Sequence, residues 1–323
     1  MLVIKGGESI PQEDIIKTPS FGLNYILGGG LWSGRYHVLW GDATAGKTTM
    51  ALYAAAEAQS RGYYVHIIDS EGSINDNWAE TCGVDKSERT VIRSGRMEEI
   101  LEYMRTHIRE GQKNFWIIDS INAIIPEDEY AEKKDGAKQA QALGARSQKL
   151  FIQRLNDYLI QDVNNIIVMV AQKSMQAAGM YWVPKANMGN YTRHMASNII
   201  RLTPSNSDKD NTTDDDGKVL VRKVTWTVEK SKQGPIAGTQ GYYFFSPVDA
   251  HIDKEEEILD IAIRNGLIKK GGAWYTWNED KVQGLAKLKD LVEINNGWEG
   301  LENELMNMKL QFDDESGAIF EAA

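Results

Sequence analysis

Residues 41–48 read GDATAGKT and fit the phosphate-binding pattern G-x-x-x-x-G-K-[ST]. In such a loop the glycines let backbone N–H groups surround phosphate oxygens, while the lysine and the hydroxyl serve the terminal phosphates and Mg²⁺. An apolar run (36–41) precedes the loop and an alanine-rich run (47–62) follows it, which favours a nucleotide site over a chance match in a glycine-bearing turn. The predicted nucleotide contacts are Gly41, Asp42, Ala43, Thr44, Ala45, Gly46, Lys47, Thr48 and Thr49.

A nucleotide site of this kind needs carboxylates as well. The apolar run NFWIIDS ends with Asp119, which suits a second Mg²⁺ ligand beside Thr48, although a strand-end cap is the alternative. Another apolar run, HIIDSEG, offers Asp69 and Glu71 at what should be the same edge of the sheet. Glu71 is therefore a candidate base for activating the attacking water, although acidic residues are common in such loops.

The elements that must position these residues follow from hydrophobic patterning. Four short apolar runs predict buried parallel strands, at 36–41, 63–69, 115–120 and 166–171. Helical segments lie between them, one following the phosphate loop and one at about 143–160. Because strands and helices alternate, the sequence predicts an α/β fold with a three-layer core and a mostly parallel sheet.

The pattern changes after residue 195. Strand-like runs flank the polar segment PSNSDKDNTTDDDG, which predicts an antiparallel extension with a long hairpin loop. A helix beginning near Lys254 opens a small α-rich lobe, and the last dozen residues carry acidic side chains without a basic one. The predicted organisation is a short N-terminal segment (1–17), an ATPase-like core (18–250), a small C-terminal domain (251–311) and an acidic tail (312–323).

One long stretch stands out by its charge. The segment KSMQAAGMYWVPKANMGNYTRH, from Lys173 to His194, contains no acidic residue in a chain of net charge -10, and it carries Tyr181 and Trp182. The acid-free region extends over 45 residues, from 163 to 207, where the chain average of 46 in 323 would give about six acidic residues. Interrupted by glycines and a proline, the stretch is predicted to be an irregular functional loop. It could bind nucleic acid through stacking and basic residues, or anchor a partner protein through its aromatic pair.

Composition limits the remaining possibilities. A pI near 5.1 argues against a protein that coats duplex DNA through bulk charge, but it leaves room for a local basic groove. The single cysteine, Cys82, excludes an internal disulfide and fits a reducing compartment. The sequence shows neither a secretory signal nor an apolar run of 18 residues, so we expect a cytoplasmic protein without a membrane partner.

Several motifs together resemble the RecA recombinases. They are TPSFGLNYILGGGLWSGRYHVLWGDATAGKTT, HIIDSEGSIND, WIIDSINAI, VEKSKQGP and NGLIKKGGAWYTW, and their order and spacing match that family from about Thr18 to about Leu310. The most specific part is LIKKGGAWYTW followed by KVQGLAKL, because the phosphate loop is shared by many other ATPases. The resemblance implies an ATP- and Mg²⁺-dependent ATPase that binds single-stranded DNA, assembles into a helical filament of identical subunits and pairs the strand with homologous duplex DNA.

The resemblance also implies roles for individual residues. Glu71 would be the catalytic glutamate, and Trp78 would lie against the adenine ring. Gln172 would sense the γ-phosphate at the start of the second DNA-binding loop. Lys230 and Lys232 would reach the γ-phosphate bound by the neighbouring subunit, where cations neutralise charge only in the assembled filament.

Two DNA-binding loops are implied in the same way. The first corresponds to residues 131–146, with candidate contacts Lys133, Lys134, Lys138 and Arg146. The second corresponds to the acid-free stretch, with candidate contacts Lys173, Tyr181, Trp182, Lys185 and Arg193.

This sequence departs from the family pattern at two places. Fewer than 20 residues precede TPSFGL, so we expect the family's N-terminal oligomerisation helix to be missing, as in a divergent, bacteriophage-type member. The segment after the second loop reads YTRHMASNI, which keeps Arg193 but replaces an aromatic with His194. Two alternatives remain: a ring-forming ATPase such as a helicase or helicase loader, and a nucleotide-switched binding module with little turnover.

Overall fold

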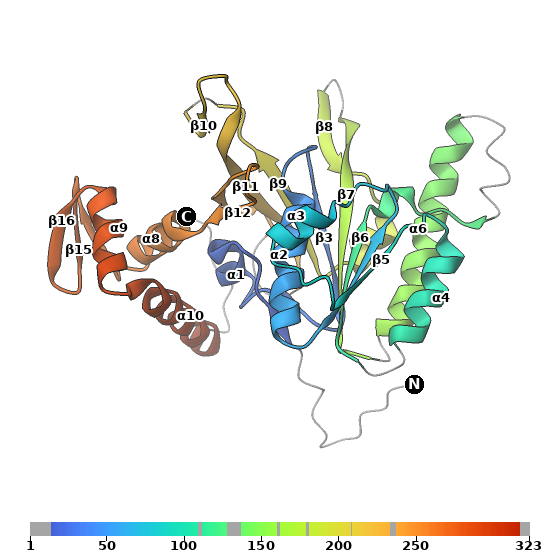
Figure 1. Cartoon of the computed structure of the whole chain (residues 1–323), viewed down its shortest axis with the longest axis horizontal. Coiled ribbons are helices and arrows are strands. Elements are labelled where there is room, and N and C mark those ends of the chain that lie inside the picture. The colour runs from blue at the N-terminus through green and yellow to red at the C-terminus, as the bar shows by residue number, and fades with distance from the viewer. Residues whose placement is uncertain are drawn as a thin grey trace, which may run out of the picture.

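The computed structural model describes residues 14–108, 112–127, 137–159, 162–178, 181–207, 209–232 and 237–316. A large sheet with strand order β13-β12-β11-β9-β3-β7-β6-β4-β5 forms its centre, with β8 beside β7 and β10 beside β11 (Figure 1). The mutually parallel strands are β3 (Arg35–Gly41), β4 (Tyr64–Asp69), β5 (Arg89–Ile92), β6 (Asn114–Asp119), β7 (Asn165–Ala178) and β9 (Asn198–Pro204). The predicted three-layer α/β core with a mostly parallel sheet is confirmed.

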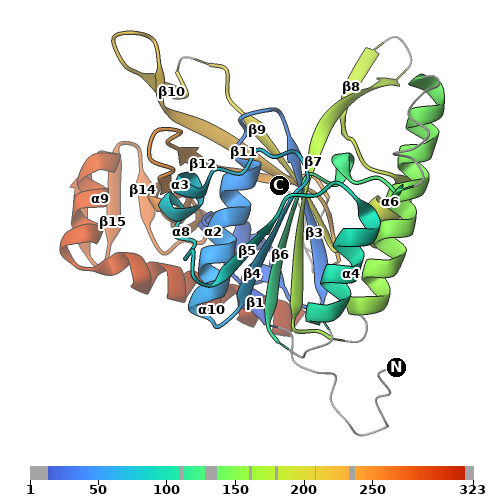
Figure 2. The same ribbon diagram turned by 45° about the vertical axis from the view of Figure 1, so that its right-hand side comes forward.

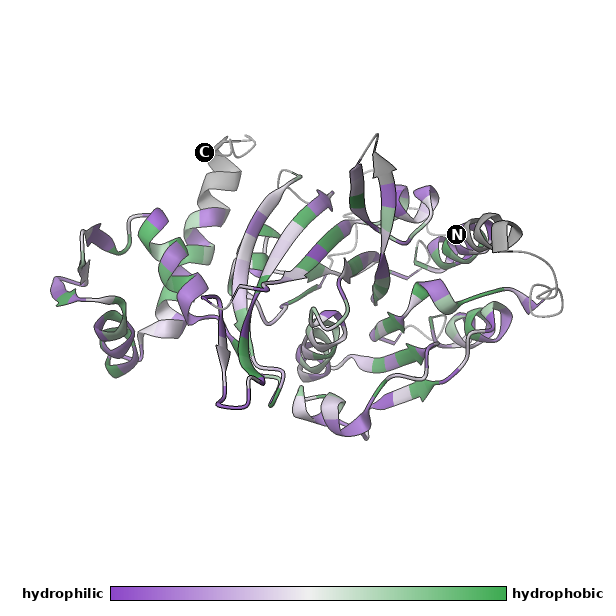
Figure 3. Cartoon of the chain, turned by 90° about the horizontal axis from the view of Figure 1, so that it is seen from above, coloured by the Kyte–Doolittle hydropathy of each residue, from purple (hydrophilic) through white to green (hydrophobic). Residues whose placement is uncertain are grey.

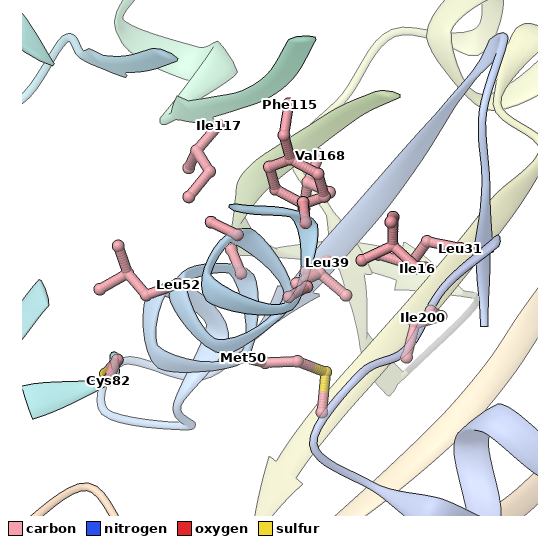
Figure 4. Close-up of a cluster of buried hydrophobic side chains, with 14 of the residues drawn as sticks. Ile16, Leu31, Leu39, Met50, Leu52, Cys82, Phe115, Ile117, Val168 and Ile200 are labelled. Atoms are coloured by element: carbon pink, nitrogen blue, oxygen red, sulfur yellow. The ribbon is translucent and has the colours of Figure 1, made fainter. Parts of the chain in front are cut away.

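Alternation along the central strands creates two hydrophobic layers. Leu39 and Phe115 face α2 (Lys47–Ser60) on one side of the sheet, as Figure 4 shows. Their neighbours Trp40 and Trp116 point to the other side, which is covered by α4 (Met97–Ile108) and α6 (Ala137–Leu159). Because successive strand residues point to opposite faces, the continuous apolar runs of these strands fill both layers at once.

Helix α2 packs closely on the sheet because its inner face is built from small residues. Ala51, Ala54, Ala55 and Ala58 are fully buried, and the helix ends at Ser60 before Gly62, which adopts a left-handed conformation. The predicted helix after the phosphate loop is confirmed.

The structure differs from prediction in the acid-free stretch. Instead of an irregular loop, β7 continues to Ala178 and pairs with β8 (Tyr181–Ala186) in an antiparallel hairpin, followed by helix α7 (Asn190–Met195). Pro184 is tolerated because β8 pairs only with β7 among the described strands, so the missing N–H can face outward. The hairpin projects from the same end of the sheet as β10 in both ribbon views (Figures 1 and 2).

A second difference concerns the region assigned to the first DNA-binding loop. Helix α6 begins at Ala137, so Lys138 and Arg146 lie on a helix and not in a loop. Arg146 is exposed. Lys133 and Lys134 lie outside the described residues.

The antiparallel extension is present as predicted. It consists of β10 (Asn211–Thr213), β11 (Val219–Ser231), β12 (Thr239–Phe245) and β13 (Ile252–Asp253). The acidic run is the turn of the polar hairpin, where the Asp214 carboxylate accepts hydrogen bonds from the backbone N–H of Asp216 (3.1 Å) and Lys218 (2.8 Å). This run therefore organises its own turn.

The C-terminal lobe combines helices with a small sheet. It contains α8 (Glu255–Arg264), β14 (Lys269–Gly271), β15 (Trp274–Trp277), β16 (Asp280–Gln283), α9 (Leu285–Ile294) and α10 (Gly297–Ser316). Viewed from above in Figure 3, the lobe lies at one end of the central sheet. Helix α10 continues through Ser316, so the segment assigned to the acidic tail begins within a helix. Among the described helices, none is both long and apolar enough to cross a membrane.

A buried carboxylate joins this lobe to the core. Glu257 on α8 accepts hydrogen bonds from Ser20 Oγ (2.8 Å) and Trp226 Nε1 (3.1 Å), and from the backbone N–H of Gly22 (3.3 Å) at the start of α1 (Phe21–Ile26). Burial raises the pKa of Glu257 to about 7, against the lowering effect of these donors. The lobe is therefore fixed to the core by specific polar contacts as well as by apolar packing.

The remaining short elements connect the core. They are β1 (Ile15–Ile16), β2 (Leu31–Trp32), α3 (Asp76–Thr81) and the 3-10 turn η1 (Ile121–Ala123). Gly28, Gly29 and Gly30 lie between α1 and β2, each with positive φ.

Candidate nucleotide and nucleic-acid site

The carboxyl ends of four neighbouring strands bring the predicted site together. Gly41 at the end of β3 is paired with Gln172 on β7, and Asp69 at the end of β4 is paired with Asp119 at the end of β6. Since parallel strands end at one edge of the sheet, the phosphate loop, Asp119, Glu71 and Gln172 lie around one crevice.

The phosphate loop has the backbone that its glycines predict. A Cβ on Gly41 would lie 2.0 Å from the carbonyl oxygen of Leu202, so a side chain cannot fit between β3 and β9 there. Thr44 adopts φ 61, an unfavourable value for a residue with a side chain, and Gly46 adopts φ 78 at the start of α2. Strain of this kind is typical of loops that bind a ligand through their backbone.

Lys47 is folded over this loop. Its ammonium group donates to the carbonyl oxygens of Asp42 (2.7 Å) and Gly41 (3.3 Å). Burial lowers the pKa of Lys47, and the nearby Asp119, Asp42 and Glu71 carboxylates oppose that effect. A phosphate group would offer Lys47 stronger acceptors than these two carbonyl groups.

Thr48 and Asp119 stand together as a candidate Mg²⁺ site. The Thr48 hydroxyl donates to Asp119 Oδ2 at 2.6 Å, and Asp119 is only 5% exposed. Burial raises the pKa of Asp119, while the Thr48 hydrogen bond lowers it. A hydroxyl and a carboxylate are hard oxygen donors, and this pair beside a phosphate loop fits Mg²⁺, which takes few protein ligands and completes its shell with phosphates and water.

The two carboxylates after β4 have different surroundings. Asp69 is 1% exposed and accepts hydrogen bonds from the backbone N–H of Ser73 (2.9 Å) and Ile74 (3.2 Å), so it shapes the loop. Glu71 is exposed and accepts hydrogen bonds from Gln172 Nε2 (2.7 Å) and from the Ser120 hydroxyl. Of the two, only Glu71 is exposed at this edge of the sheet.

Three residues that the sequence analysis did not single out also contact the site. The Asn122 amide oxygen accepts a hydrogen bond from Gln172 N–H (3.0 Å), and Asn187 N–H donates to the Gln172 carbonyl (2.8 Å). On the other flank, Arg222 Nη1 donates to Thr44 Oγ1 at 3.4 Å. Sequence reasoning missed these residues because a single asparagine or arginine does not indicate its own partner. Asn122 lies within the motif WIIDSINAI, but only the strand order brings it and the other two residues to this edge of the sheet.

Comparison with known proteins decides the family. Residues 2–237 match the RecA N-terminal domain, and residues 256–306 match the RecA C-terminal domain. The chain belongs to the RecA family of recombinases. The predicted resemblance is thereby confirmed over most of the chain.

Individual relatives agree with this result. The chain is 31% identical to "Protein RecA" of Rickettsia bellii over 298 residues, which cover 91% of this chain and 84% of that protein. It is 27% identical to "Protein RecA" of Chloroherpeton thalassium over 323 residues, or 97% of this chain and 88% of that one. It is 30% identical to the "Mitochondrial DNA repair protein recA homolog" of Dictyostelium discoideum over 292 residues, covering 88% and 62% respectively.

In this RecA-family chain, Trp78 lies beside the helix that follows the phosphate loop. Its indole N–H donates to Thr49 Oγ1 at 3.1 Å, and the ring is half-buried against the core. The exposed part of the ring leaves a flat apolar surface near the loop. Contact of this ring with adenine stays a prediction.

The β7–β8 hairpin presents its aromatic pair to solvent. Tyr181 is 74% exposed and Trp182 is 67% exposed, and Lys185 lies on the same strand. Arg193 lies instead on α7, where its guanidinium group pairs with Glu229 at 3.6 Å. Lys173, at the base of the hairpin, pairs with Asp42 of the phosphate loop. The predicted DNA contacts of this stretch therefore fall into two sets. Tyr181 and Trp182 are exposed on the hairpin, whereas Lys173 and Arg193 already pair with carboxylates of the same chain.

Lys230 and Lys232 lie away from the phosphate loop of their own chain. Lys230 pairs in register with Ile199, which is level with Val38 on β3, three residues before the loop begins at Gly41. The Lys230 ammonium group donates to the carbonyl groups of Arg193 (2.8 Å) and His194, and that of Lys232 donates to Met195 O (3.0 Å). Burial lowers the pKa of both lysines. Within the described residues, neither forms an ion pair.

Proposed function

We propose that this chain is an ATP-dependent recombinase that forms a filament on single-stranded DNA and pairs it with homologous duplex DNA, with hydrolysis stimulated by DNA. The observation that carries the proposal is the contact between Glu71 and Gln172 at 2.7 Å. Gln172 is followed directly by the hairpin that exposes Tyr181 and Trp182. A group suited to activate water is thus one hydrogen bond away from β7, the strand that pairs with β8 in the hairpin carrying the aromatic pair.

Each residue of the crevice has a separate role in this proposal. Backbone N–H groups of the loop and Lys47 would bind the phosphates, and Thr48 with Asp119 would hold Mg²⁺. When bound, Mg²⁺ neutralises charge that develops on the phosphate oxygens. Glu71 would orient a water molecule and accept its proton, while Gln172 fixes the position of the Glu71 carboxylate. Trp78 would cover one face of the base.

The hairpin supports binding of single-stranded DNA of any sequence. Tyr181 and Trp182 can stack on bases without reading them, and the strand has no acidic residue that would repel phosphates. Lys185 on β8 and the exposed Arg146 on α6 would add local positive charge. A groove with local positive charge is compatible with the overall charge of -10.

We expect that replacing both Tyr181 and Trp182 with Ala weakens binding of single-stranded DNA by about tenfold to a hundredfold, since base stacking contributes roughly 1–3 kcal/mol per base. Affinity for ATP should not change, because both side chains lie at the exposed end of the hairpin. Fluorescence anisotropy with a labelled oligonucleotide measures the loss. Ile294→Ala, at a side chain 79% exposed in the C-terminal lobe, is the control for removing exposed apolar surface. An unchanged DNA affinity in the double variant would exclude stacking by this pair.

The proposal as a whole is tested by the ATPase rate with and without single-stranded DNA. We expect a clear stimulation by DNA, and electron micrographs with a non-hydrolysable ATP analogue should show helical filaments. Rings in place of filaments would support the helicase-like alternative. A rate that DNA does not alter would reject the recombinase function, and ATP binding without turnover would support a nucleotide-switched module.

A further inference from the structure

An ion pair joins the phosphate loop to the base of the hairpin. The Lys173 ammonium group contacts Asp42 Oδ1, and the two side chains are 31% and 35% exposed. The contact follows from strand register. Gly41 and Gln172 are the last pair between β3 and β7, so Asp42 directly follows the end of β3 and Lys173 is the next residue of β7. Sheet geometry therefore places these two side chains together.

Lys173 also begins the hairpin. It is paired with Ala186 on β8, the last pair at the hairpin's base. The preceding residue, Gln172, contacts Glu71 on the opposite flank of the crevice. Two consecutive residues of β7 thus contact both sides of the nucleotide site, one at the candidate base and the other at the phosphate loop.

The ion pair with Lys173 offsets the negative charge of Asp42. Asp42 is the second residue of a loop that would surround a polyphosphate, and a carboxylate beside several phosphate charges is repulsive. Lys47 contacts the backbone carbonyl of Asp42, not its carboxylate. In the described part of the chain, Lys173 is the cation that forms an ion pair with this carboxylate.

We propose that Lys173 is a positioning residue of the nucleotide site, which neutralises Asp42 and ties the hairpin to the phosphate loop, and not a DNA contact. This inference rests on the proposed ATP-dependent function. Neutralisation lets the loop accept phosphates in spite of its carboxylate. The tie means that a change at the loop displaces the base of the hairpin, so that nucleotide binding alters DNA affinity.

The test compares Lys173→Met, Asp42→Asn and the double variant in the full chain. With a fluorescent non-hydrolysable ATP analogue, we expect Lys173→Met to bind about tenfold more weakly, because it leaves an uncompensated carboxylate beside the phosphates. The double variant should return to within about threefold of the wild-type affinity, because the repulsive charge is gone. Lys218→Met, at an exposed lysine beside the acidic turn of the other hairpin, is the control for losing one surface charge.

A second measurement tests the tie between the two elements. Without nucleotide, Lys173→Met should bind single-stranded DNA within about twofold of wild type, while the increase in DNA affinity caused by the analogue should be lost in both single variants and in the double variant. Thermal unfolding checks that all variants are folded. We expect that they are, because the side chains of the pair are about a third exposed.

The outcomes separate the possibilities. Normal nucleotide affinity with weakened DNA binding in Lys173→Met would overturn the proposal and make Lys173 a DNA contact. A double variant as weak as Lys173→Met would overturn neutralisation and indicate that Lys173 contacts phosphate itself. If the wild-type chain binds no nucleotide, the proposed function fails first; if it binds and hydrolyses ATP while every variant equals it, this inference alone fails.

Discussion

Glu71→Gln should lower kcat for DNA-stimulated ATP hydrolysis by about 10²–10⁴-fold, the usual contribution of a positioned general base. Glutamine has the same shape and can still accept hydrogen bonds from Ser120 and Gln172, but it cannot take a proton from water. ATP affinity should stay close to wild type, because Lys47 and the loop backbone are unchanged. Single-turnover hydrolysis and equilibrium binding of a fluorescent analogue measure the two quantities separately.

Glu80→Gln is the matched control for this change. Glu80 is an exposed glutamate on α3 whose nearest cationic partners lie 3.9 Å away, so its loss should leave hydrolysis unaltered. If Glu71→Gln keeps more than about a tenth of the wild-type rate, Glu71 is not the base. Asp69 is a poor substitute, because its buried carboxylate is engaged by backbone N–H groups of its own loop.

The arrangement of the candidate nucleotide site could be predicted from the sequence because its parts are local. The phosphate loop is one contiguous motif, and Asp119 closes a buried apolar run whose length and composition predict a parallel strand. Parallel strands share a carboxyl edge, so separate strand ends could be assigned to one crevice before the order of the strands was known. The parallel core follows from the same apolar runs.

The hairpin was not predictable from periodicity. Residues 173–178 and 181–186 extend beyond the body of the sheet, and most of their described side chains are at least partly exposed. Nothing therefore selects an alternation of apolar and polar residues, and Pro184 argues against a strand unless the strand lies at an edge. Exposure, which leaves the side chains of this segment free to contact a ligand, also removes the alternation that would identify a strand.

The contacts between residues on different strands of the site could not be predicted from the sequence, for a different reason. Lys173 and Asp42 are 131 positions apart, and Glu71 and Ser120 are 49 apart. Their proximity depends on β7 lying beside β3 and on β6 lying beside β4, which is strand order and not strand identity. The sequence predicts a DNA contact for Lys173, because a lysine in an acid-free stretch shows its charge but not that Asp42 is its partner.

The position of Lys230 and Lys232 predicts catalysis across a subunit interface. Both ammonium groups face the C-terminal carbonyl groups of α7 and lie toward the amino ends of the parallel strands, away from the loop at Gly41. In the described structure they contact α7 and not the phosphate loop of their own chain. In a head-to-tail filament, every such surface meets the next subunit in the same way, so the lysines of one chain can face the crevice of its neighbour.

Replacing Lys230 and Lys232 together with Ala should therefore lower DNA-stimulated hydrolysis by about 10³-fold, the lower end of what cations supplied in trans contribute. A loss alone would not prove the role, because the same lysines cap α7 and their removal could disturb the hairpin that precedes it. An experiment that mixes two inactive variants separates these explanations. Subunits with Glu71→Gln keep both lysines, and subunits with the lysine changes keep Glu71, so each inactive variant supplies what the other lacks.

In an equal mixture on one DNA strand, about a quarter of the interfaces should join an intact Glu71 to intact lysines, and hydrolysis should return to about that fraction of the wild-type rate. Lysines that act within their own chain give no recovery, because no subunit in the mixture carries both parts. Lysines that only support α7 give none either, because the subunits with intact Glu71 would keep their disturbed hairpin. Recovery thus requires that the active site be completed by the neighbouring subunit, which would make hydrolysis depend on assembly.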